Sequence, residues 1–182
     1  MEIEINGMLN NPYEGIKNYG VFERAIVSVG KFFLEHLGKE AMDGPKLFID
    51  NAPSASGPVP IIFPVFDEYL IIKLGVEGKE SEAQVAFQFS HELMHYVYYT
   101  KYGLKREMAD EREEAICTAA SLCVIAKIYK EELKGCVQYM LENVTDKRYR
   151  AGEKLAQKIR YDFDRLINEG ENVFEEIWES ED

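Results

Sequence analysis

The sequence has few cysteines, glycines and prolines, and it has no long apolar run. Three cysteines in 182 residues, none in a CxxC pair, argue against a disulfide scaffold or a cysteine-rich zinc site. Thirteen glycines and six prolines without a repeat exclude a collagen-like chain. No stretch approaches the roughly 20 apolar residues of a membrane helix, and residues 1–6 lack the basic and apolar regions of a secretory signal. We therefore expect reduced thiols in a cytoplasmic protein.

The chain also has fewer basic than acidic residues. The chain has 21 Lys and Arg against 33 Asp and Glu, and its net charge is −12. Nucleic acids and anionic membranes would repel such a chain, so we expect neither as a partner. The oligomeric state stays open.

The composition predicts a globular protein, because 46% of its residues are hydrophobic. Strand signals early in the chain and helix signals late predict the α+β class. We expect one domain over residues 1–182, with a core at about 14–130 and a helical C-terminal extension at about 131–182. Short apolar runs predict a small mixed or antiparallel sheet from strands at 46–50, 61–63 and 69–74. The last two are expected to form a hairpin, and the prolines that flank its first strand predict that this strand is broken or lies at an edge. Periodicity and turn residues predict helices at 14–37, 82–102, 110–129, 131–141 and 145–168.

The candidate metal-binding and catalytic residues lie in the segment Ser90-His91-Glu92-Leu93-Met94-His95. Two histidines four residues apart on a helix lie on successive turns, with Cβ atoms about 5–6 Å from each other. Their imidazoles can bind one metal ion. Glu92 is rotated by about 100° from His91, so it borders the ion without being a ligand. This HExxH pattern predicts Zn²⁺ bound by His91 and His95, with Glu92 as the general base for a metal-activated water. The alternative is a pair of surface histidines on an amphipathic helix.

A catalytic zinc site needs a third protein ligand. The remaining histidine, His36, is expected to be a surface or core residue, so we expect a carboxylate from the next helix. Helical angles favour Glu114, and Glu111 is the second choice. The neighbouring acids Asp110 and Glu113 are expected to be a solvated first turn that the helix dipole favours.

Together, the segments His91–His95 and Glu114–Cys117 resemble those of gluzincins, and the short chain with its Glu-x-x-Cys segment is similar to the ImmA/IrrE family of compact metallopeptidases. The resemblance covers residues 45–125. It implies a zincin-like domain with an active-site HExxH helix. It also implies that the strand at 69–74 is a sheet edge that pairs with an extended peptide. The functional residues that it implies are the zinc ligands His91, His95 and Glu114 and the catalytic base Glu92.

The leading expectation is a hydrolase, a zinc metallopeptidase that acts on a peptide or protein. One alternative is a non-catalytic or occluded zincin-like regulator that binds a partner protein. Another is metal-assisted hydrolysis of a substrate other than a peptide, since the metal chemistry is shared. Substrate, cleavage specificity and the group that stabilises the oxyanion stay open, and tyrosines near the end of the HExxH helix are candidates for that last role.

Overall fold

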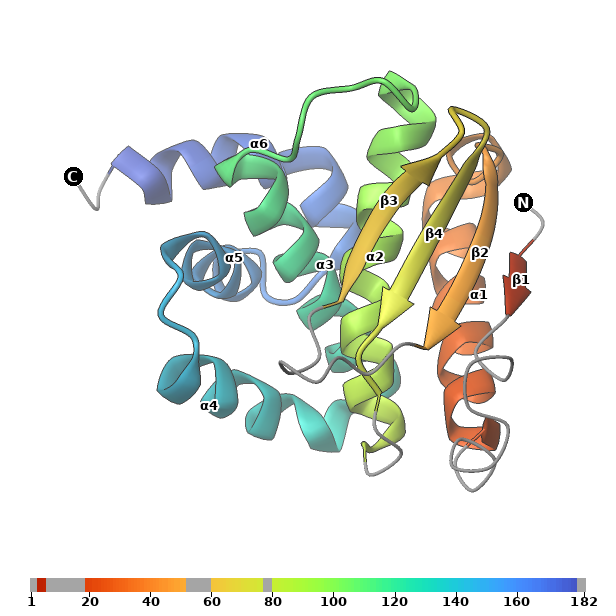
Figure 1. Cartoon of the computed structure of the whole chain (residues 1–182). Coiled ribbons are helices and arrows are strands. Elements are labelled where there is room, and N and C mark those ends of the chain that lie inside the picture. Colours follow the sequence, from red (N-terminus) through yellow and green to blue (C-terminus); the bar gives the residue numbers. More distant parts are fainter. Residues whose placement is uncertain (1–2, 6–18, 52–59, 77–79, 180–182) are drawn as a thin grey trace. The chain divides into compact units, whose positions relative to one another are not determined.

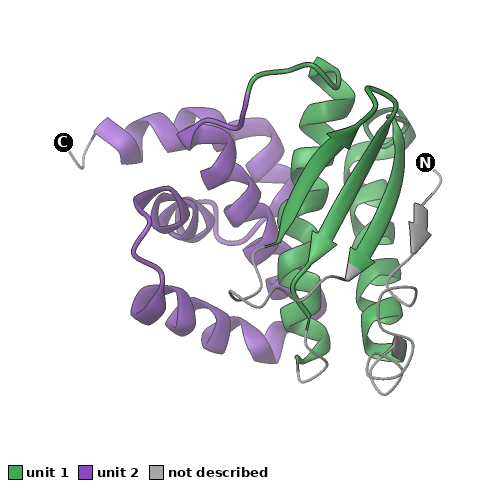
Figure 2. Ribbon diagram, in the orientation of Figure 1, with its two compact units in different colours: residues 1–107 green, residues 108–182 purple. Residues whose placement is uncertain are grey.

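A computed structural model describes residues 3–5, 19–51, 60–76 and 80–179. Two compact units divide the chain, residues 1–107 and residues 108–182 (Figure 2). The first unit combines a sheet with helices and the second is helical (Figure 1). The predicted α+β class is therefore confirmed, while the single domain stays a prediction.

The sheet of the first unit is mixed, with strand order β1-β2-β4-β3. Strands β1 (Ile3–Ile5), β2 (Lys46–Asn51) and β4 (Tyr69–Leu74) run parallel, and β3 (Ile61–Val65) pairs antiparallel with β4. The predicted hairpin is confirmed. The strand β1 was not predicted, since three residues are too few for a periodic signal.

The prediction that residues 69–74 form a sheet edge is wrong. Strand β4 is paired on both sides, with β2 in register Leu47↔Leu70 and with β3 in register Ile62↔Ile72. Strand β3, which contains Pro64, lies at one edge of the sheet, as the prolines predicted. Proline has no backbone N–H to donate to a neighbouring strand, and an edge strand tolerates this loss because one of its sides is unpaired.

Alternating side chains of β2 and β4 build the core of the first unit. One face of these strands is fully buried, through Leu47, Ile49, Leu70, Ile72 and Leu74. Helix α2 (Glu82–Tyr102) packs against β3 and β4, and α1 (Tyr19–Ala41) packs beside α2 (Figure 1). Gly38 lies within α1 with φ 79°, so the helix is kinked where the sequence predicted its end. The predicted start of this helix, Glu14, lies outside the described residues.

The second unit packs around α3 (Glu111–Ile128), which is buried from Ala115 to Ile125. Helices α4 (Leu133–Asn143, after a 3-10 turn at Lys130–Glu132), α5 (Lys147–Lys158) and α6 (Phe163–Glu179) surround it. Helices α3 and α5 approach closely at Gly152, where a Cβ would lie 2.5 Å from Cβ of Thr118 and 2.6 Å from the carbonyl oxygen of Ala115. None of the described helices combines the length and apolar composition that a membrane span requires.

The predicted helix at 145–168 is wrong in extent. It breaks after Lys158, and Arg160 and Tyr161 take positive φ angles of 62° and 57°. Asp162 then caps α6 by accepting the backbone N–H of Arg165 at 3.0 Å. The sequence gives no signal for this break, because Arg160 and Tyr161, and not a glycine, adopt the left-handed region.

Candidate metal centre

Helix α2 is anchored at its start, its middle and its end. Ser81 caps it in a capping box with Gln84, and Gly103 ends it with φ 86°, both as predicted. The Gln88 side chain accepts the backbone N–H of Gly75 at 3.0 Å, which ties the helix to the end of β4. These contacts hold the turn that carries His91 against the sheet.

Tyr96, which follows the second histidine, ties α2 to the connection between α1 and β2. Its hydroxyl donates to the carbonyl of Pro45 at 3.0 Å and accepts the backbone N–H of Gly44 at 3.1 Å. Burial raises the pKa of this phenol. Because the hydroxyl is engaged in the protein interior, Tyr96 is a structural residue and not a donor to a reacting oxyanion.

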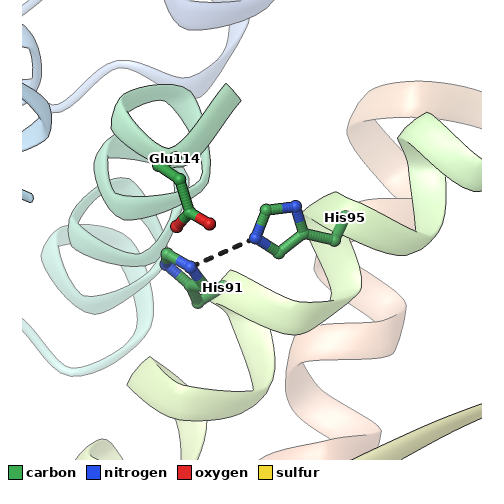
Figure 3. Close-up of side chains that lie close together, drawn as sticks. All are labelled: His91, His95 and Glu114. Carbon is green, nitrogen blue, oxygen red and sulfur yellow. Dashed lines mark hydrogen bonds between the residues drawn. The ribbon is translucent and has the colours of Figure 1, made fainter. Parts of the chain in front are cut away.

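The two imidazoles on α2 converge. Nε2 of His91 and Nε2 of His95 lie 3.3 Å apart, and the ring planes are inclined by 71° (Figure 3). Two nitrogens on one tetrahedral ion, each bound at about 2.0–2.1 Å, lie about 3.3 Å from each other. The rings therefore have the spacing of two ligands on one ion without any change of rotamer.

Both histidines are buried, with exposed fractions of 8% for His91 and 6% for His95. The alternative of a surface pair on an amphipathic helix is thus wrong. Glu92, next to His91, is only 4% exposed. A buried carboxylate beside two nitrogens that could bind a metal ion is a suitable acceptor for the proton of a metal-activated water.

The acids at the start of α3 differ sharply in burial. Asp110 caps the helix by accepting the backbone N–H of Glu113 at 2.8 Å, and it is exposed, as is Glu111. Glu114 is half-buried. The described residues include a group that can hold a metal ion, formed by His91, His95 and Glu114, the three side chains that Figure 3 labels.

The prediction of a solvated Glu113 is wrong, because its side chain is only 6% exposed. Glu113 lies on the side of α3 that carries Cys117 and Ala120, both fully buried. A second group that can hold a metal ion consists of His95, Glu113 and Cys117. Sequence reasoning missed this group; the Glu113–Cys117 spacing of four residues was the available signal.

Outside these groups, the remaining candidates pack against other side chains. The ring of His36 lies 4.3 Å from that of Phe32 and is half-buried, as expected of a packing residue. Tyr98 stacks on Tyr102 at 6.1 Å, and the guanidinium of Arg106 lies 4.7 Å from the ring of Tyr99. These contacts assign no oxyanion donor.

No protein-family model, curated protein or solved structure matches this chain. The function must therefore be argued from the side chains themselves.

Proposed function

We propose that the protein is a zinc-dependent peptidase that hydrolyses a peptide bond with a metal-activated water. The observation that carries this proposal is the buried pair His91 and His95, whose Nε2 atoms lie 3.3 Å apart with Glu92 beside them on the same helix. Three free cysteines support a reducing, cytoplasmic setting.

We assign the third ligand to Glu114. A catalytic zinc site has three protein ligands and one open position. The group with Glu114 uses both imidazoles, whereas the group with Glu113 and Cys117 uses His95 alone. The first group therefore accounts for the whole histidine pair, with oxygen and nitrogen donors that suit Zn²⁺.

Zinc held by these residues would polarise the peptide carbonyl and lower the pKa of a water molecule. The chain supplies the proton transfer. The Glu92 carboxylate accepts a proton from the attacking water and delivers it to the leaving amine. Burial of Glu92 keeps bulk water away from this exchange.

The test of the base is Glu92→Gln, which keeps the size and the hydrogen bonding of the side chain but cannot accept the proton. We expect normal zinc content and loss of metal-dependent cleavage by at least about 100-fold, the lower range for a general base. The exposed Glu131→Gln, at an acid outside the candidate ligands, serves as the control. Full activity of the Glu92 variant would remove the assignment.

The test of the third ligand compares Glu114→Ala with Glu111→Ala and Glu113→Ala in a zinc competition titration. We expect the Glu114 change alone to weaken zinc binding strongly. A larger effect at Glu113 would move the ligand to the group with Cys117, and a larger effect at Glu111 would favour the exposed acid.

Burial of the histidines and of Glu92 also favours a second candidate, a zincin-like regulator with an occluded site that acts by binding a partner protein. This alternative predicts zinc binding without cleavage of peptides or of whole proteins. Partner binding that is equal in wild type and Glu92→Gln, with no cleavage by either, would favour the regulator over the peptidase.

A further inference from the structure

Arg148, in the first turn of α5, is held by the residue that caps its own helix. Its Nε lies 3.0 Å from Oδ1 of Asp146, and its Nη2 lies 2.6 Å from Oδ2. Oδ1 of Asp146 also accepts the backbone N–H of Arg148 at 2.9 Å. A guanidinium fixed in this way has already lost most of the rotamer freedom that binding would remove.

Arg148 lies near Glu114 within the second unit. The backbone of α5 touches α3 at Gly152, next to Ala115 and Thr118, and Arg148 is about one helical turn before Gly152. Hydrogen bonding to Asp146 is the main cause that raises the pKa of Arg148, and the negative charge of Glu114 adds to it. The guanidinium is therefore a neighbour of the proposed third ligand.

Arg148 also has donors left for a ligand. A guanidinium carries five N–H groups, and Asp146 engages Nε and Nη2. Across the residues that the structure describes, Nη1 has no hydrogen bond to the protein, and 39% of the side chain is exposed. The neighbouring cations are engaged elsewhere: Lys147 lies 4.8 Å from the Trp178 ring, and Arg150 donates to carbonyl oxygens at the end of α4.

We propose that Arg148 binds a carboxylate of the peptide substrate and selects substrates that carry this charge close to the bond that is cleaved. The inference rests on the proposed peptidase function. A chain of net charge −12 repels anionic peptides in general. A fixed guanidinium can offset this repulsion at one place, because it binds a carboxylate through parallel, charge-assisted hydrogen bonds.

The carboxylate belongs either to the C-terminus of the peptide or to an Asp or Glu side chain. Three pools of random eight-residue peptides distinguish these sources: one with free C-termini, one with amidated C-termini, and one amidated and lacking Asp and Glu. Cleavage by the zinc-loaded full chain is measured by mass spectrometry. Binding is measured separately with zinc-loaded Glu92→Gln, which retains peptides without cleaving them.

We expect one of the two carboxylate sources to raise both cleavage and binding by about 10- to 100-fold over the uncharged pool. Arg148→Gln removes this preference, chiefly through KM, at unchanged zinc content. Arg148→Lys keeps a cation that pairs with Asp146 but loses the planar fork, so it retains only part of the preference. The control Lys158→Gln removes a charge from the exposed end of α5 and leaves the preference intact.

The failures of the two proposals are distinguishable. Cleavage without a carboxylate preference, or a preference that survives in both Arg148 variants, overturns the role of Arg148 and leaves the peptidase standing. Binding that prefers carboxylates and depends on Arg148, without cleavage by wild type, supports the role of Arg148 and removes the peptidase. Absence of both cleavage and selective binding overturns both.

Discussion

Replacing His95 by glutamine tests the geometry on which the proposed metal centre depends. The two Nε2 atoms are already 3.3 Å apart, the spacing required by a tetrahedral ion with bonds of about 2.0–2.1 Å. Little of the binding free energy is then lost to rearrangement. Loss of a residue that only supports a ligand weakens metal binding by about 10- to 100-fold. Loss of His95 itself should therefore raise the zinc Kd by at least about 100-fold, equivalent to about 2.8 kcal/mol.

The assay is a competition between the protein and a chromophoric zinc chelator of known affinity. The matched control is His36→Gln, which removes an imidazole from α1, where the ring packs on Phe32. We expect its zinc Kd to stay within about twofold of the wild-type value. X-ray absorption of the wild-type complex should show two nitrogen ligands at about 2.0–2.1 Å. Zinc binding by His95→Gln at wild-type strength, or equal weakening by both variants, would refute the geometric reasoning.

Three further predictions concern the elements that position the site. Gly152→Ala should lower the free energy of unfolding by about 1–3 kcal/mol or more, because its Cβ would meet Thr118 at 2.5 Å; urea unfolding measures the change. Tyr96→Phe should lower the free energy of unfolding by about 1–3 kcal/mol, because it leaves the N–H of Gly44 without its acceptor, and an unchanged urea midpoint would contradict this role. Hydrogen bonding from the arginine two residues later lowers the pKa of Asp146, so its ionised carboxylate contributes stability above the ordinary pKa of about 3.9. That contribution is lost as the pH falls through the lowered pKa of the folded state; the stability difference between wild type and Asp146→Asn should therefore be larger at pH 7 than at pH 2.

Local patterns were enough to predict the helix that carries the histidines. Ser81 and Gly103 bound α2 as predicted, because a capping hydroxyl and a glycine with positive φ act through bonds to the nearest turn. The convergence of His91 and His95 follows in the same way from the helical repeat. The hairpin and the edge position of β3 also depended on neighbouring residues, two prolines among them.

Tertiary structure decided what depends on segments distant in the chain. Strand β4 reads as a plain apolar run whether it is central or at an edge, and only its pairing with β2 makes it central. Glu113 and Asp110 look alike as acids of a first helical turn, yet packing buries Glu113 and leaves Asp110 exposed. Periodicity reports the environment of one segment, whereas strand order and burial of a charge are properties of several segments packed together.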